Sequence, residues 1–146
     1  DEVAAWLEEN KSRSQAFFTV DDLTYLRRGG RISAVAATVG TMLDLKPIIT
    51  EGRNGKLLST DKVRGRKQAL RTLAELAAQN IDDPAEAEMY VLHADAPEDA
   101  DRLAQLLREK IPGLGNISTR YVGPVIGAHC GPGTVAVCFF GKERPY

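Results

Sequence analysis

Two glycine-rich stretches hold the residues that could bind an anion. The first, residues 25–33 (YLRRGGRIS), places three arginines around a Gly-Gly pair. Glycine tolerates positive φ and exposes its backbone N–H group, so such a turn could form an anion-binding concavity. The guanidinium of Arg31 would add a planar fork that suits a carboxylate or a phosphate. This stretch therefore predicts recognition of an anion.

The second stretch, residues 127–134 (GAHCGPGT), contains one of the two histidines of the chain. Small residues on both sides of His129 would let a ligand and the backbone approach its imidazole closely. Gly131, Gly133 and Thr134 complete the candidate site, although Thr134 could either donate to an anion or simply begin the next strand. We expect the two turns to bind one anionic ligand whose remainder is apolar.

Other chemistries are disfavoured by the same residues. No Cys or His pair has metal-ligand spacing, so we expect neither a metal nor a cofactor, and His93, which closes a predicted strand, is expected to be structural. Cys130 adjoins His129, but sequence neighbours rarely present side chains to one another, which disfavours covalent catalysis. The Gly131-Pro132-Gly133 run is not a dinucleotide motif, and its proline removes a donor that a phosphate would use.

Composition places the chain among ordinary globular proteins. Its 146 residues fit one domain, residues 1–146, with 43% hydrophobic and 27% charged residues. The net charge of −1 argues against nucleic-acid binding, and no apolar run is long enough for stable membrane insertion. Two cysteines favour a reduced, cytoplasmic setting. The chain opens directly in an amphipathic helical pattern, as if it were part of a longer protein.

The first half of the chain alternates predicted strands and helices. We expect a strand over 16–20 and a helix capped by Asp21 or Asp22 that ends at Gly29-Gly30. A hairpin of 45–50 and 56–61 should follow, in which the strand with Pro47 lies at a sheet edge or is paired on one side only at that residue. The uncharged segment 34–43 could be a buried helix, a lipid-pocket wall, or both. A helix from the basic cluster 64–67 to about Gln79 should bury one apolar stripe, and the cluster itself is a solvated helix entrance or, less favoured, a docking surface.

The second half follows the same alternation. Strands are expected over 88–93, 117–122 and 134–140, and a helix with a capping box at Asp95 and Glu98 should end at Pro112. Six strands and about four longer helices predict an α/β domain of two layers, with a mixed six-stranded sheet covered by helices.

These motifs, taken together and in order, resemble those of the DegV family. They are residues 18–26 (FTVDDLTYL) leading to Gly29-Gly30-Arg31-Ile32, then 45–49 (LKPII), 55–56 (GK), 63–65 (VRG) and 123–133 (GPVIGAHCGPG). The resemblance covers nearly the whole chain. It corresponds to the second half of a two-domain protein, which implies that an N-terminal domain is absent here.

The resemblance implies a bacterial protein without enzymatic activity that binds a long-chain fatty acid. The acyl chain would lie in a tunnel of this domain and the carboxylate where the two domains meet, for presentation to a fatty acid kinase. By position in the motifs, His129 would lie beside the carboxylate, and Arg31 would serve the head group and, with Arg28, the kinase encounter. The best candidates for tunnel walls are the segment that contains Met42 and the strand residues Ile48 and Ile49.

Two other functions stay open at this point. An association domain without its own ligand would use Arg28, Arg31, Arg64 and Arg66 as an interface for dimerisation or docking. A thiol hydrolase using Cys130 ranks third. Replacing His129 by alanine separates the fatty acid carrier, which would lose its lipid, from the association domain, which would not respond.

Overall fold

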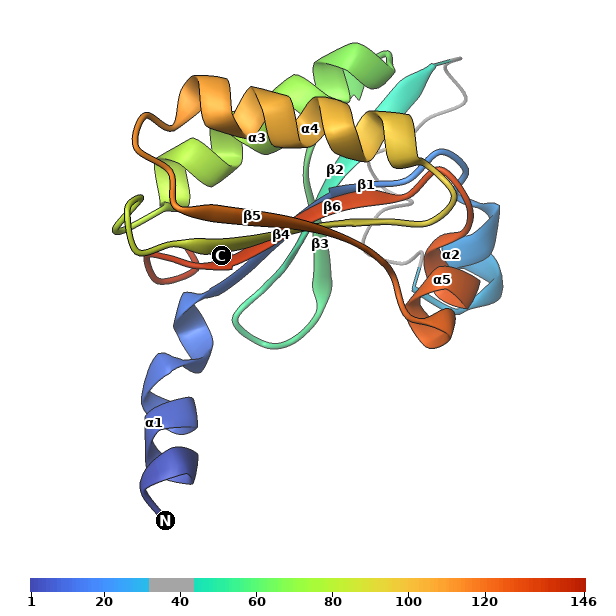
Figure 1. Cartoon of the computed structure of the whole chain (residues 1–146). Coiled ribbons are helices and arrows are strands. Elements are labelled where there is room, and N and C mark those ends of the chain that lie inside the picture. Colours follow the sequence, from blue (N-terminus) through green and yellow to red (C-terminus); the bar gives the residue numbers. More distant parts are fainter. Residues whose placement is uncertain (32–43) are drawn as a thin grey trace.

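A mixed sheet of six strands organises the structure, a computed structural model that describes residues 1–31 and 44–146 (Figure 1). Its strand order is β3-β2-β1-β6-β4-β5, and only β4 and β5 pair in parallel. The strands are β1 (Ser14–Thr19), β2 (Leu45–Glu51), β3 (Leu57–Arg64), β4 (Glu88–His93), β5 (Asn116–Tyr121) and β6 (Val135–Phe140). The predicted mixed six-stranded sheet is confirmed.

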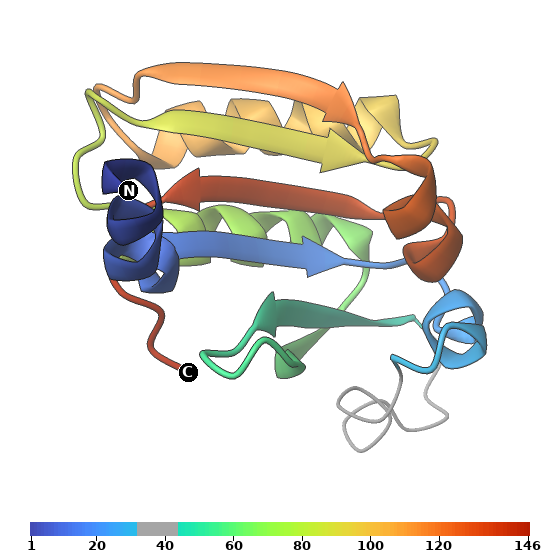
Figure 2. The same ribbon diagram turned by 90° about the horizontal axis from the view of Figure 1, so that it is seen from below.

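Two helices cover one face of this sheet, and the other helices of the described residues lie at its two ends. The helices of the described residues are α1 (Glu2–Asn10), α2 (Thr24–Arg28), α3 (Arg66–Asn80), α4 (Pro97–Lys110) and α5 (Pro124–Cys130), with a short 3-10 turn η1 (Lys11–Arg13) after α1. Helices α3 and α4 lie on one face, as Figure 1 shows. Figure 2, which views the molecule from below, shows α2 and α5 at one end of the sheet and α1 at the other.

The main core lies between the sheet and helices α3 and α4. Every residue of the predicted α3 stripe is buried, namely Ala69, Leu70, Leu73, Ala74 and Ala77. The α4 stripe is buried as predicted, namely Ala100, Leu103 and Leu107, with Ile111 just beyond the helix. Each fully buried leucine contributes about 1.5–3 kcal/mol relative to an exposed one, so these two stripes hold the two layers together.

The end of α2 follows the sequence prediction, whereas its predicted cap is wrong. Leu23, and neither Asp21 nor Asp22, occupies the N-cap position, and no side chain caps the helix there. The carboxylate of Asp22, one residue earlier, accepts the backbone N–H of Thr24 at 2.8 Å, and this bond lowers the pKa of Asp22. The helix ends at Arg28, and Gly30 adopts a φ of 71°, which favours glycine. Pro47 pairs with Lys62 of β3, whereas β1 reaches only Ile49 and Thr50 of β2, so Pro47 is paired on one side only.

The predicted capping box of α4 is wrong. Ala96 occupies the N-cap position, and no side chain caps the helix. Asp95 has a φ of 51°, and the N–H of Ala96 donates to Nδ1 of His93 at 3.3 Å. His93 is 4% exposed and its ring lies 4.4 Å from that of Tyr121. The imidazole of His93 therefore performs the structural role that the sequence predicted for it.

Helix α5 was not predicted. It occupies residues that looked like the start of a glycine-rich turn, and only Gly131 to Thr134 form the turn itself. Gly123 at the N-cap and Pro124 in the first turn are ordinary helix-start signals. His129 consequently lies in the last turn of a helix, which fixes its backbone more firmly than a loop would.

Candidate functional site

A cavity of about 910 Å³ lies on the sheet face that α3 and α4 leave open. Side chains of alternate strand residues define that face, since Phe17 packs in the main core whereas Ala16 and Phe18 line the cavity. The cavity is bounded by β1, β4, β6, the β2–β3 hairpin, α2 and α5. Its described lining residues are Ala16, Phe18, Leu26, Gly30, Arg31, Gly55, Lys56, Leu57, Leu58, Leu92, Val122, Val125, Ile126, His129, Cys130, Thr134, Ala136 and Cys138.

Small side chains form the floor of the cavity. Ala136 of the central strand β6 lies between two larger residues, Phe18 on β1 and Leu92 on β4. Two residues further along β6, Cys138 lies beside Ala16 of β1. We call the strip formed by Ala16, Ala136 and Cys138 the trough. Its small side chains leave room above the sheet for an apolar chain.

The predicted site residues His129 and Arg31 both line this cavity, and both lie beside Gly29 at its α2–α5 end. Nη1 of Arg31 donates to the carbonyl of Gly29 at 2.6 Å. A Cβ atom added to Gly29 would lie 2.2 Å from Nδ1 of His129, so the missing side chain of Gly29 makes room for the imidazole. Both side chains thus surround one glycine and line one cavity, which places a guanidinium and an imidazole at the end of an apolar space.

The backbone of the two glycine-rich stretches does not offer the predicted anion concavity. The N–H groups in question all donate within the protein: Gly29 to Tyr25, Gly30 to Arg27, Arg31 to Leu26, Gly131 to Gly127 and Gly133 to Ala94. That prediction is wrong, because these N–H groups are used by the backbone hydrogen bonds at the ends of α2 and α5 and in the turn after α5. An anion bound here would have to be recognised by side chains.

Gly131 and Gly133 make room for neighbouring side chains, and the hydroxyl of Thr134 donates within the protein. A Cβ atom on Gly131 would lie 2.3 Å from the ring of Tyr25, and one on Gly133 would lie 2.6 Å from Asp21. Thr134 lines the cavity, but its hydroxyl is 2.8 Å from the carbonyl of Gly131 and 3.1 Å from that of Cys130. The single hydroxyl proton of Thr134 is therefore used to fix the end of α5.

The remaining predicted site residues are dispersed. Ile48 packs in the main core on the α3 side of the sheet, so its side chain does not face the cavity. Ile49 is fully buried in a small second cluster with Leu26 and Cys130, and it is not among the lining residues. Arg28 is exposed in the last turn of α2. Met42 and the rest of segment 34–43 fall outside the described residues.

Sequence reasoning missed the lining contributed by α5 and β3. Val125 and Ile126 of α5 are 70% and 54% exposed, and Leu57 and Leu58 of β3 lie across the cavity on the hairpin. The Val-Ile pair after Gly123-Pro124 was visible as an apolar pair at a helix start. It was not recognised because the glycines that follow suggested a continuous turn.

The two cysteines line the cavity as thiols. Burial raises the pKa of Cys130, and it raises the pKa of Cys138 to about 11. The thiolate is the nucleophilic form, so these environments weigh against the thiol hydrolase hypothesis. Within the described residues, no group of His, Cys, Asp and Glu could hold a metal ion, and no helix is both long enough and apolar enough to cross a bilayer.

Comparison with known proteins identifies the family of this fold and site. The model of the DegV family, a family of uncharacterised proteins, matches residues 1–142. The chain belongs to the DegV family. It is 43% identical over 144 residues to a DegV domain-containing protein of Clostridium perfringens, covering 99% of this chain and 49% of the relative. It is 34% identical over 142 residues to Protein DegV of Bacillus subtilis, covering 97% of this chain and 50% of the relative. The chain thus spans about half the length of the curated relatives.

Solved structures of DegV proteins share the fold. A fatty acid binding DegV family protein of Streptococcus agalactiae has a TM-score of 0.82 at 29% identity, covering 98% of this chain and 50% of that one. A DegV lipid binding protein of Thermotoga maritima has a TM-score of 0.80 at 30% identity, with coverage of 98% and 49%. DegV of Bacillus subtilis, described as a fatty acid binding protein, has a TM-score of 0.73 at 34% identity, with coverage of 97% and 49%.

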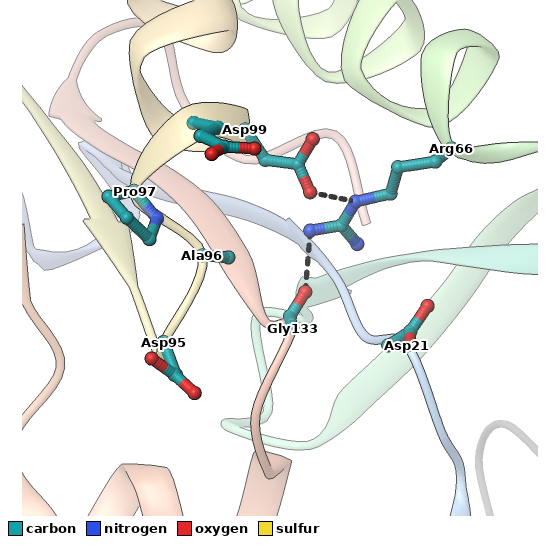
Figure 3. Close-up of a pocket in the computed structure, with 8 residues that line it drawn as sticks. Asp21, Arg66, Asp95, Ala96, Pro97, Asp99 and Gly133 are labelled. Carbon is teal, nitrogen blue, oxygen red and sulfur yellow. Dashed lines mark hydrogen bonds and ion pairs between the residues drawn. The ribbon is translucent and has the colours of Figure 1, made fainter.

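This DegV chain has a second, smaller cavity of about 380 Å³ near the starts of α3 and α4. Figure 3 shows Arg66 in it, with Nε donating to Asp99 at 2.7 Å and Nη2 donating to the carbonyl of Gly133 at 2.5 Å. Its side chain is 20% exposed. Arg66 is therefore an internal contact, which corrects its assignment to a surface patch with Arg64.

Proposed function

We propose that this chain binds a long-chain fatty acid, with the acyl chain along the trough and the carboxylate at His129 and Arg31. The observation that carries the proposal is the cavity of about 910 Å³ with an imidazole and a guanidinium gathered at one end. The DegV proteins of known structure that bind fatty acids or lipids support it, because they share this fold at 29–34% identity.

Elementary energetics favour such a ligand. Burying an acyl chain contributes about 0.8 kcal/mol for each methylene group. The carboxylate would be costly to desolvate without charged or hydrogen-bonding partners, and His129 and Arg31 can supply them. Another cation, Lys56, lines the cavity from the β2–β3 turn. Figure 2 shows this turn at the end of the sheet away from α2 and α5. Only the α2–α5 end combines two nitrogen-bearing side chains among the described lining residues, so we assign the carboxylate to that end.

The protein acts as a carrier without catalysing a reaction, and it presents the carboxylate to a fatty acid kinase in the bacterial cytoplasm. The exposed side chains beside the carboxylate end support this step of the proposal. Arg28 is exposed on α2, and Val125 and Ile126 are exposed on α5, so a partner could approach the carboxylate over both helices.

The chain corresponds to the second half of a two-domain DegV protein, whose other half covers α1. None of the nine residues of α1 is buried, and Val3, Trp6 and Leu7 are 67%, 52% and 54% exposed. An isolated helix shorter than about 12–15 residues is marginal in water. An apolar face on so short a helix is best explained by a covering domain, and the matched relatives are about twice as long as this chain.

Lipid extraction tests the proposed function. Mass spectrometry of lipid extracted from the full-length protein, expressed with fatty acid available, should detect bound fatty acid. His129→Ala should lower its retention about tenfold or more, because a hydrogen bond to a charged group is lost, while the circular dichroism spectrum is unchanged. An association domain without a ligand would carry no lipid in either form and would not respond to this substitution, which would contradict the proposal.

A further inference from the structure

A short turn separates the two cavities of the chain. We call residues 131–134 the 131–134 turn; Thr134 lines the larger cavity and Gly133 lines the smaller one. The N–H of Gly133 donates to the carbonyl of Ala94 at 2.7 Å, and the N–H of Ala94 donates to the carbonyl of Thr134 at 2.9 Å. The turn is thereby joined to the end of β4, and its two faces look into different cavities.

The 131–134 turn also fixes the end of α5. The Thr134 hydroxyl bonds the carbonyls of Cys130 and Gly131, and the N–H of Gly131 closes the helix on Gly127 at 2.8 Å. His129 lies in the helical turn between these contacts. A shift of the 131–134 turn would therefore tilt the last turn of α5 and move the imidazole of His129.

Arg66 holds this turn from the side of the smaller cavity. Its guanidinium spans two partners at once, Asp99 in the first turn of α4 and the carbonyl of Gly133 (Figure 3). The rigid, planar fork of arginine suits such a two-point contact, which a lysine ammonium could not reproduce. The carboxylate of Asp99 fixes the guanidinium, and the guanidinium fixes the Gly133 carbonyl.

We propose that Arg66 is a positioning residue for the carboxylate end of the larger cavity, acting through Gly133, the 131–134 turn and His129. The inference rests on the proposed function, since it assigns the fatty acid carboxylate to His129. Arg66 does not line the larger cavity, and the hydrogen bonds of its guanidinium go to Asp99 and Gly133 rather than to residues of the trough. Loss of Arg66 should impair recognition of the carboxylate and leave binding of the acyl chain unchanged.

A comparison of two ligands separates positioning from a general structural role. We would measure the affinity of the full-length protein for a fatty acid and for the fatty alcohol of the same length, which lacks the carboxylate. Arg66→Ala should weaken binding of the acid about tenfold, as expected for a lost charge-assisted hydrogen bond, and should leave binding of the alcohol within about twofold. Arg71→Ala, an exposed position on the same helix, is the matched control and should change neither.

Double substitution tests the route through His129. If Arg66 acts by positioning the imidazole, Arg66→Ala combined with His129→Ala should bind the acid no more weakly than His129→Ala alone, because coupled residues are not additive. Asp99 supplies variants that leave Arg66 in place. Asp99→Asn keeps an oxygen acceptor for Nε and should behave like the wild type, whereas Asp99→Leu should reproduce Arg66→Ala.

Four results would overturn the inference. An equal loss of acid and alcohol binding in Arg66→Ala would indicate a merely structural role, and additive losses in the double variant would exclude the route through His129. Unchanged acid binding in Arg66→Ala or Asp99→Leu would remove this inference and leave the proposed function intact. A wild-type protein that binds neither ligand would instead refute the proposed function, and this inference with it.

Discussion

At the scale of single residues, Gly29 sets the geometry of the candidate carboxylate site. Its carbonyl accepts a hydrogen bond from Arg31, and its missing side chain leaves space for His129. The two glycines of the Gly-Gly pair thus have different roles. Gly29 has an ordinary φ of −77°, whereas Gly30 has a φ of 71° with no atom near its would-be Cβ.

This contrast predicts opposite effects of two neighbouring substitutions. Gly29→Ala should displace His129 and weaken fatty acid binding, because the new Cβ would lie 2.2 Å from Nδ1 of His129. Gly30→Ala should cost about 1 kcal/mol or more of stability through its positive φ and should affect binding less. Ligand titration and urea unfolding of both variants would check this, and equal binding losses would contradict the steric role of Gly29.

Cys138 gives a pH dependence at the same scale. Burial raises its pKa from 9.0 to about 11, so the folded protein holds the thiol proton more tightly than the unfolded chain does. Its contribution to stability is fully present below pH 9 and is lost as pH rises from 9.0 towards 11. The free energy of unfolding should therefore fall less steeply across this window in Cys138→Ala than in the wild type. Parallel curves from urea unfolding would contradict the raised pKa.

At the scale of elements, the sequence predicted most of the framework. Strand β4 was predicted with its observed bounds and the α3 stripe residue by residue, because periodicity reports directly on which side chains are buried. The predicted α4 stripe is buried too, but it left out Ala104 and Leu106. The missed helix α5 is short and contains Gly127. Its glycine suggested a turn, although Gly123-Pro124 is an ordinary helix start. The acceptors of the glycine N–H groups are decided by how the turns fold, and hydrophobic periodicity does not predict them.

The candidate site was predictable only in part for the same reason. His129 and Arg31 stood out by their glycine neighbours, and the fold brings them to one cavity. Ile48 and Ile49 both looked like possible walls, but adjacent strand residues face opposite sides of a sheet, and the register across β1 and β6 decides which side holds the cavity. The trough itself arises from residues far apart in the sequence.

The trough predicts a variant that shortens the accepted ligand. Ala136→Leu would place a larger side chain between Phe18 and Leu92, in open cavity rather than in the packed core. We expect the longest fatty acids to bind more weakly by about 1–3 kcal/mol, the range for overpacking, and shorter acids to be less affected. Mass spectrometry of co-purified lipid would check this against Ser14→Leu, an exposed β1 position outside the cavity lining. An unchanged length distribution would exclude the trough as the path of the acyl chain.

At the scale of the whole molecule, apolar side chains of α1 and of the end of β6 are exposed together. Trp6 lies against Phe140 with ring centroids 5.8 Å apart, and both residues are 52% exposed. In the two-domain arrangement that we propose, the other half of the protein would cover this apolar end.

Hydrogen exchange would test that arrangement. Backbone amides of α1 should exchange much more slowly in the full-length protein than in the 146-residue chain alone, because a covering domain would suppress fraying. Amides of α3, which packs on the sheet in this chain, serve as the internal control and should exchange slowly in both. Equally rapid exchange of α1 in the two proteins would contradict a covering domain.

A crystal structure of the full-length protein with a bound fatty acid would test the central claim most directly. We predict elongated density along Ala136 and Cys138, with the carboxylate within hydrogen-bonding distance of His129 and Arg31. Because the segment from Thr134 through the end of β6 at Phe140 extends about 20 Å at about 3.3 Å per residue, a fatty acid of long-chain length would fit along it. A carboxylate beside Lys56 would contradict the assigned orientation, and a ligand bound away from β6 would contradict the account as a whole.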